Sequence, residues 1–301
     1  MKRMGLIVLA GALVVAPRVG AQEQEQPVKQ LAGTLKKIES SGAVALGYRE
    51  ASFPLSYVDR GGNPLGYSLD ICRAIVEEIG REIDRPHIRT ELVLVTSETR
   101  IQALLSGKID LECGSTTNNV ERQKQVAFSP IMYVTGTKLM VRRGSGIASY
   151  RDLAGKVTVV TAGTTNEQAL KRLDEKQKLG LKLVSASDHE ASYAMVADRK
   201  ADAFATDDVL LYGLIARHQA QREFIVVGDF LSYDPYGIMF RKDDPQLADL
   251  VTATFRQLAE SRDLLEIYHR WFVRRTPTGE RLNLPMNAQL EETFRVLGLD
   301  E

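Results

Sequence analysis

Short apolar runs rich in β-branched residues alternate along the chain with segments whose apolar positions recur every three to four residues. The first pattern predicts strands and the second predicts amphipathic helices. We expect strands at 44–48, 91–95, 108–113, 138–143, 156–163, 181–186, 202–206, 224–228 and 236–241. We expect helices at 69–82, from an N-cap at Ser97 to Gly107, and at about 166–178, 188–199, 207–220 and 245–272. Strands separated by helices are typical of parallel sheets in α/β proteins.

The two ends of the chain follow other patterns. Lys2 and Arg3 precede the apolar run GLIVLAGALVVA, and the small residues VGA follow at 19–21. This layout is typical of a secretory signal peptide, residues 1–21, cleaved near Ala21, and the run is too short to span a bilayer comfortably. The tail, residues 276–301, is expected to be an extended segment with one helix near 287–297.

Composition narrows the class of protein. The chain has 301 residues, 44% hydrophobic and 26% charged, which is enough for two globular domains. It carries 39 basic and 39 acidic residues, and removing residues 1–21, which hold three basic and no acidic ones, leaves a net charge of about −3. Because no basic stripe is present, the sequence argues against nucleic-acid binding.

The chain contains two cysteines, Cys72 in an expected helix and Cys113 at an expected strand end. An even count in an exported protein permits one disulfide. A disulfide and two buried thiols are both compatible with the sequence.

Polar clusters follow several of the expected strands. They are Tyr48-Arg49-Glu50, Thr96-Ser97 with Arg100, GSTTNNVER at 114–122, TAGTTNE at 161–167 and Thr206-Asp207-Asp208. Open α/β sheets bind ligands at the carboxyl ends of their strands. Hydroxyls and free backbone N–H groups where a strand turns into a helix suit an anion, and an arginine adds a two-pronged donor for a carboxylate or phosphate.

Motifs of common enzymes are absent from the sequence. We find no G-x-S-x-G, Walker loop, G-x-G-x-x-G or H-E-x-x-H motif. His189-Glu190 lacks the second histidine of a zinc motif, and the four histidines are scattered. Neither a metal site nor a cofactor site is predicted.

The chain resembles the bacterial periplasmic solute-binding proteins of amino-acid ABC transporters, and within them the glutamate/aspartate-binding proteins. The resemblance runs in family order over essentially all of the chain after the signal peptide, and ECGSTTNNVERQKQ is its most specific part. The stretches that carry it are VALGYREASFPLSY (44–57), GYSLDICRAIVEEI (66–79), TSETRIQALLSGKIDLECGSTTNNVERQKQVAFS (96–129), VVTAGTTNE (159–167), SASDHEAS (185–192), ADAFATDD (201–208) and YGIMFRKDDP (236–245). Leu55 departs from the family, which often has phenylalanine there.

The resemblance implies a two-lobed periplasmic-binding-protein fold of type II, with two α/β lobes joined by two hinge strands. Carried over, lobe one covers 22–131 plus 237–275, lobe two covers 137–231, and the hinge strands lie at 132–136 and 232–236. The ligand would be clasped between the lobes.

The resemblance also implies roles for individual residues. Arg122 would grip the α-carboxylate of an amino acid, with Thr117 as its hydroxyl helper and Thr164 and Thr165 meeting the same group from lobe two. Ser115 would offer its backbone carbonyl, and Asp207 its carboxylate, to the α-ammonium. Positions that the family uses for the side-chain carboxylate are occupied here by Arg49, Ser97 and Arg100, with His189 joining from lobe two or simply capping a helix.

The function implied is an exported, periplasmic and monomeric binding protein that captures L-glutamate or L-aspartate and delivers it to an amino-acid ABC permease. Two alternatives stay open. One is an exported dehydratase on the same fold, similar to cyclohexadienyl dehydratase, for which Glu50 and Glu112 are the nearest candidate acids. The other is a ligand-sensing module for a receptor, which would differ in its partner and not in its site.

Overall fold

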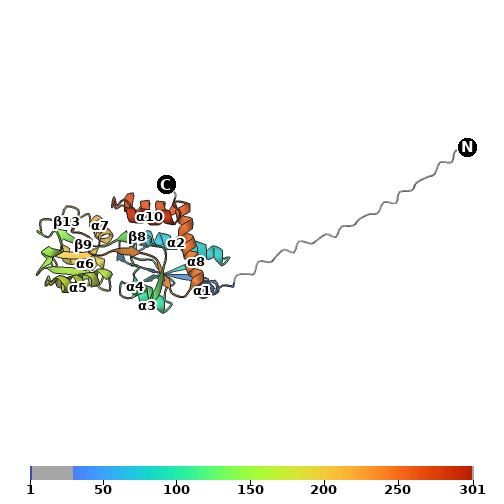
Figure 1. Ribbon diagram of the computed structural model, residues 1–301, viewed down its shortest axis with the longest axis horizontal. Helices are drawn as coiled ribbons and strands as arrows, with labels where there is room; N and C mark the ends of the chain where they lie inside the picture. The colour runs from blue at the N-terminus through green and yellow to red at the C-terminus, as the bar shows by residue number, and fades with distance from the viewer. Residues whose placement is uncertain (2–29, 300–301) are drawn as a thin grey trace. The chain divides into compact units, whose positions relative to one another are not determined.

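The computed structural model describes residue 1 and residues 30–299, so the expected signal peptide and its cleavage point lie outside the described residues. Two five-stranded sheets organise the rest (Figure 1). None of the helices within residues 30–299 combines the length and the apolar character that crossing a membrane requires.

The first sheet has the strand order β5-β1-β6-β15-β7, and the elements around it are called lobe one below. Strand β1 pairs parallel with β5 and β6, whereas β15 runs antiparallel to β6 and β7. The strands are β1 (Ala43–Tyr48), β5 (Arg89–Leu94), β6 (Leu111–Glu112), β7 (Val126–Phe128) and β15 (Met239–Arg241), with a small sheet of β2 (Ala51–Ser52), β3 (Ser56–Val58) and β4 (Pro64–Leu65). Its helices are α1 (Gly33–Ser41), α2 (Tyr67–Glu82), α3 (Arg100–Leu105), α4 (Val120–Gln123), α8 (Pro245–Glu260), α9 (Asp263–Tyr268), a π-helical turn (His269–Val273) and α10 (Ala288–Val296).

The second sheet has the order β11-β10-β12-β9-β13 and organises lobe two. Strand β10 is parallel to β11 and β12, and β9 is antiparallel to β12 and β13. Its elements are β9 (Thr137–Arg142), a 3₁₀ turn (Tyr150–Leu153), β10 (Val157–Thr161), α5 (Thr165–Gln177), β11 (Lys182–Ala186), α6 (His189–Ala197), β12 (Ala203–Asp207), α7 (Asp208–Arg217) and β13 (Phe224–Val227). The expectation of parallel sheets is therefore wrong for β9 and β15, because the chain crosses between lobes before each of them.

Two short antiparallel strands, β8 (Tyr133–Thr135) and β14 (Asp234–Tyr236), pair between the lobes, with Thr135 opposite Asp234. We call them the hinge strands. They lie within the ranges expected for the crossings, 132–136 and 232–236, and the exact lobe boundaries stay a prediction.

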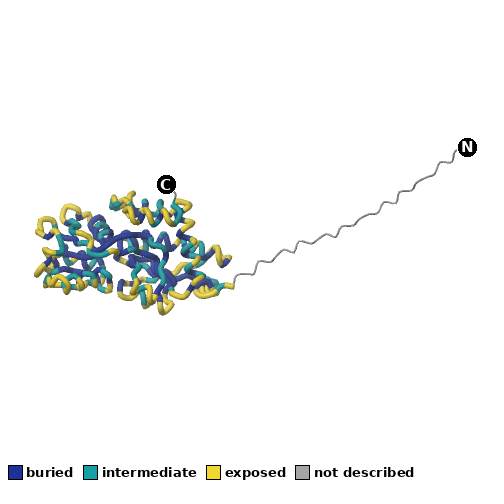
Figure 2. Tube along the Cα trace, in the orientation of Figure 1, coloured by how far each residue is buried: buried dark blue, intermediate teal, exposed yellow. Residues whose placement is uncertain are grey.

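Alternating side chains of the second sheet feed two separate cores. Met140, Val159 and Phe204 pack with α6 and α7 on one face, while neighbouring strand residues such as Val160 pack with Leu170 of α5 on the other. A sheet covered on both faces explains why its strands read as nearly continuous apolar runs. Buried residues run through the interior of both lobes (Figure 2).

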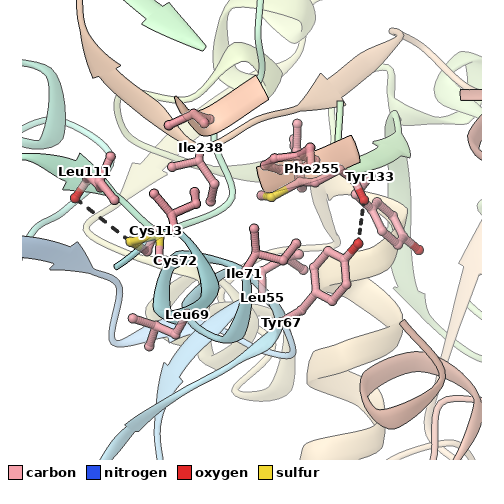
Figure 3. Close-up of a cluster of buried hydrophobic side chains, with 14 of the residues drawn as sticks. Leu55, Tyr67, Leu69, Ile71, Cys72, Leu111, Cys113, Tyr133, Ile238 and Phe255 are labelled. Atoms are coloured by element: carbon pink, nitrogen blue, oxygen red, sulfur yellow. Dashed lines mark hydrogen bonds between the residues drawn. A yellow bond between two sulfur atoms is a disulfide. The ribbon is translucent and has the colours of Figure 1, made fainter. Parts of the chain in front are cut away.

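The core of lobe one is stapled by a disulfide between Cys72 on α2 and Cys113 just after β6, with the Cα atoms 6.2 Å apart (Figure 3). The sequence alone is compatible with either this disulfide or two buried thiols. Close by, the Ser68 hydroxyl donates to the Gly114 carbonyl at 2.8 Å. Both links fix the start of the 114–122 polar turn to a long buried helix.

The tail ends in α10, close to the expected helix. Leu290 and Phe294 of α10 are buried in the core of lobe one. Asn287 caps the helix by accepting from Leu290 N, and its side-chain amide donates to the Val134 carbonyl of β8 at 3.1 Å. The tail thus joins lobe one to a hinge strand.

Two helix predictions were wrong, one at the start of the helix and one in its middle. The helix expected from Ser97 begins at Arg100, with Thr99 as its N-cap residue. The single helix expected at 245–272 is broken after α8, because Arg262 adopts a left-handed conformation with φ 66°. The strand expected at 236–241 is likewise split between β14 and β15.

Candidate functional site

A small polar cavity lies between the two lobes. Its lining residues are Ser97, Arg100, Ser115, Thr117, Thr164, Thr165, Asn166, His189, Asp207 and Leu210. Eight of the ten residues predicted to bind a ligand are among them, whereas Arg49 and Arg122 are not.

Arg100 lies at the lobe-one wall and is almost completely buried. Its Nη1 donates to Thr116 Oγ1 at 2.6 Å and to the Ser115 carbonyl at 3.3 Å, while its Nε has no hydrogen-bond partner among the described residues. The Thr116 hydroxyl in turn donates to Glu112 Oε2 at 2.6 Å. Burial lowers the pKa of Arg100, and the nearby Glu112 carboxylate opposes that shift. The Ser115 carbonyl expected to meet an ammonium therefore faces Arg100.

Arg49 is absent from the lining of this cavity and lines a neighbouring pocket instead. It is 2% exposed, its Nη2 donates to Ser97 Oγ at 2.8 Å, and its Nη1 is buried without a partner in the part of the chain that the structure describes. Burial and the like charge of Arg100 lower the pKa of Arg49 to about 10, so it stays cationic at neutral pH. Ser97 thus carries a hydrogen bond from Arg49 instead of capping a helix.

Arg122 occupies α4, where its backbone N–H is capped by the Asn119 side chain. Its guanidinium donates to the Thr117 carbonyl at 2.8 Å and is partly exposed. Burial and the like charge of Arg100 lower the pKa of Arg122 to about 9. Arg122 holds the turn that presents Thr117 to the cavity.

Asp207, at the end of β12, supplies the acid of the cavity. Its Oδ1 accepts from Asn166 Nδ2 at 2.8 Å, and its Oδ2 accepts a short hydrogen bond from the Tyr236 hydroxyl. Burial, reinforced by the neighbouring Asp234 carboxylate, raises the pKa of Asp207 well above its usual value. A cation in the cavity would offset both causes. The adjacent Asp208 instead accepts from the Thr135 hydroxyl at 2.6 Å.

Three threonines form the seam between the lobes. Thr117 Oγ1 of lobe one lies 3.2 Å from Thr165 Oγ1 of lobe two and donates to Asp234 Oδ1 at 3.1 Å. Thr164 is the N-cap of α5, accepting from Glu167 N and donating to the Thr161 carbonyl. The cavity therefore meets the N-terminus of a 13-residue helix, which favours negative charge.

His189 is the first residue of α6, and the helix is capped by Asp188 and not by the histidine. His189 is 2% exposed, and its Nδ1 lies 2.8 Å from Thr161 Oγ1. Burial, with the positive charges of Arg49 and Arg100, lowers the pKa of His189 well below its usual value. The imidazole is therefore neutral at pH 7.

Sequence reasoning missed Asn166 and Leu210 among the lining residues. Asn166 stands inside TAGTTNE, directly after the two predicted threonines, so the polar cluster held a signal for it. Its amide bridges Asp207 and the Thr137 hydroxyl. Leu210 has no local signal, because an apolar residue in a helix most often enters the core of its own domain.

A match over residues 44–274 to the model of "Bacterial extracellular solute-binding proteins, family 3" decides the family. The chain belongs to this family. Its two-lobed type II fold and its two sheets agree with that membership.

Individual relatives narrow the comparison. The chain is 40% identical over 286 residues to the L-glutamate/L-aspartate-binding protein of Pseudomonas aeruginosa, covering 94% of this chain and 92% of the relative. It is 39% identical over 285 residues to the glutamate/aspartate import solute-binding protein of Salmonella typhimurium, covering 95% and 93%. A solved ancestral amino acid-binding protein, a precursor of cyclohexadienyl dehydratase, superimposes with a TM-score of 0.70 at 27% identity, covering 79% of this chain and 99% of that one.

The candidate acids of the dehydratase alternative are placed differently from each other. Glu50 is exposed. Glu112 is buried, its Oε2 accepts a hydrogen bond from the Thr116 hydroxyl, and Glu112 does not line the cavity. The relatives in this family matched at 39–40% identity are binding proteins.

Proposed function

We propose that this chain is an exported solute-binding protein that captures L-glutamate or L-aspartate between its lobes and delivers it to an amino-acid ABC permease. The observation that carries the proposal is the convergence of buried Arg100, backed by Arg49, and of Asp207 on one small cavity between the lobes. Membership in the family and the names of the relatives support the same reading.

The charges of the site mirror those of an acidic amino acid, which carries two negative groups and one positive group. Asp207 would pair with the α-ammonium, which would relieve the burial of its own carboxylate. The α-carboxylate would meet the N-terminus of α5 at Thr164 and Thr165 from one lobe, and Thr117 from the other. Arg122 would hold that turn and contribute its positive charge.

The side-chain carboxylate would be read by Arg100 and Ser97, with Arg49 behind them. Since Arg49 Nη1 and Arg100 Nε are buried without partners within residues 30–299, an anion is the ligand group that best compensates them. His189, held through Nδ1 by Thr161, has Nε2 free to contact the same carboxylate. A ligand that touches both lobes stabilises the closed form, because an uncompensated buried charge disfavours closure without it.

Selectivity follows from the same charges. Glutamine and asparagine would bring no negative charge to Arg49 and Arg100, so we expect a preference for the acidic ligand that approaches ~10⁴-fold. Calorimetric titration of the purified protein with L-glutamate, L-aspartate, L-glutamine and L-asparagine measures it. Equal affinity for acids and amides would refute the assignment of the side-chain carboxylate.

Periplasmic location, processing near Ala21 and a monomeric state belong to the same proposal. N-terminal sequencing of the mature protein tests the first two, and light scattering tests the third. A sensory role would be indicated if deletion of the gene abolished a response to glutamate but left its uptake unchanged.

A further inference from the structure

One face of α7 runs along the boundary between the lobes. Leu210, Gly213 and Arg217 are spaced by three and four residues, so they lie on the same side of the helix. Leu210 lines the cavity, and Asp207 stands just before the helix begins. The same helix that starts at the cavity therefore continues along lobe one for roughly 14 Å, at 1.5 Å per residue.

Gly213 is the point of closest approach on this face. A Cβ atom placed there would lie 2.3 Å from the carbonyl oxygen of Phe53 and 3.1 Å from its carbonyl carbon. Phe53 belongs to the β2–β3 turn of lobe one, whereas Gly213 belongs to lobe two. Because the obstacle is backbone, any side chain at 213 would force the lobes apart.

Arg217 forms a polar contact across the same boundary. Its Nη2 donates to the Val58 carbonyl at 2.9 Å, and its guanidinium carbon lies 5.1 Å from the centre of the Tyr57 ring. The Tyr57 hydroxyl is 2.7 Å from Thr278 Oγ1, which fixes the ring in lobe one. Within lobe two, Glu190 Oε1 lies 3.6 Å from Arg217 Nε and orients the side chain.

We infer that this face of α7 is part of the closure interface, and that Gly213 and Arg217 set ligand affinity without touching the ligand. The N-terminal end of α7 is tied to the crossing segment by Asp208 N–H donating to the Gly136 carbonyl at 3.0 Å. Arg217, at the other end of the helix, is farther from that pivot, so opening must separate it from Val58 and Tyr57. The inference rests on the proposed function, because it requires a ligand that stabilises closure.

The energetic consequence is a population shift. Ligand affinity is multiplied by the fraction of the protein that can reach the binding-competent form. Weakening the Arg217 contacts or adding a methyl group at Gly213 lowers that fraction for every ligand alike. The ratio of affinities for glutamate and aspartate, which is set inside the cavity, stays unchanged.

The experiment compares Gly213→Ala, Arg217→Ala and Arg217→Lys with the parent chain, using Arg222→Ala, an exposed arginine of lobe two, as the matched control. L-Glutamate and L-aspartate are titrated by calorimetry, dissociation rates are measured by stopped flow, and thermal unfolding is recorded without ligand. Small-angle scattering follows closure as ligand is added.

Gly213→Ala and Arg217→Ala are expected to raise Kd for both ligands roughly tenfold or more, mainly through faster dissociation. Arg217→Lys recovers part of the loss because it can still donate to Val58. Ligand-free Gly213→Ala should unfold at the same or a higher temperature, since alanine favours a helix more than glycine does and the three nearest atoms to the added Cβ all belong to Phe53.

Two outcomes overturn the inference. One is that Gly213→Ala and Arg217→Ala bind glutamate as tightly as the parent chain does. The other is a loss of affinity that follows a matching loss of ligand-free stability. If the parent chain itself binds neither L-glutamate nor L-aspartate, the proposed function is refuted instead.

Discussion

Replacing Arg100 with alanine gives the sharpest test of how the cavity reads charge. Arg100 is 2% exposed and donates to Thr116 Oγ1 and the Ser115 carbonyl, with Glu112 as the nearest acid through Thr116. Its removal takes a cation from the ligand carboxylate and also removes one of the three positive charges near the buried Glu112, which keeps Arg49 and Arg122. These two losses must be separated before either is interpreted.

The expected magnitude follows from breaking a buried charge pair, which costs about 3–5 kcal/mol. At about 1.4 kcal/mol per decade, Kd for L-glutamate should rise by roughly two to three and a half decades. L-Glutamine offers no side-chain charge, so its Kd should rise by about one decade or less. The preference for acid over amide should therefore fall by at least about tenfold.

The assay is calorimetric titration with L-glutamate and L-glutamine on four proteins: the parent chain, Arg100→Ala, Glu112→Gln and the double variant. Glu112→Gln removes the buried negative charge that would lose one nearby cation in Arg100→Ala. The double variant should regain most of the ligand-free stability lost in Arg100→Ala, measured by urea unfolding, yet not its acid preference. If Arg100→Ala weakens glutamate and glutamine by the same factor, Arg100 supports the Ser115–Thr116 turn and does not read the carboxylate.

Three further predictions follow from other contacts. Burial raises the pKa of Asp207 and a ligand ammonium would lower it, so ligand binding releases a proton near that raised pKa. As pH falls through the raised pKa, Kd should rise by up to about tenfold per pH unit; titrations over a series of pH values measure this, and the dependence should vanish in Asp207→Asn. Replacing both Cys72 and Cys113 with serine removes a cross-link between residues 41 positions apart, and it should lower the free energy of unfolding in urea by about 4 kcal/mol. Reductant should have no further effect on this variant. Asn287→Ala removes a helix cap and a donor to Val134 and should cost about 1–2 kcal/mol by the same measurement, whereas exposed Gln289→Ala should be near neutral.

Local sequence signals predicted the elements whose ends are fixed by local contacts. The helix expected at 166–178 is α5, because Thr164 caps its first turn with a hydroxyl that needs no distant partner. Seven of the ten candidate residues belong to the clusters at strand ends and line one cavity, since the strands of a sheet bring their carboxyl ends to one edge. The eighth candidate in the lining, His189, comes from the family resemblance. The family match over 44–274 confirms the resemblance seen in those same motifs.

The failures depend on contacts between distant segments. Ser97 has the chemistry of a cap, but its hydroxyl accepts from Arg49, 48 positions away. The break after α8 comes from Arg262 adopting a left-handed conformation, which apolar spacing does not encode. Leu210 reaches the cavity because of which face α7 turns toward the other lobe. Pattern alone cannot specify such packing between lobes.

The anchoring of α10 has a practical consequence for optical sensing. Leu290 and Phe294 tie the tail to lobe one, so a fluorophore attached beyond α10 would travel with that lobe. Ser145, exposed in the turn that follows β9, would carry a second dye on lobe two, where the neighbouring Gly144 and Gly146 have open space around them. Energy transfer between the two dyes would then report ligand binding as a change in fluorescence emission.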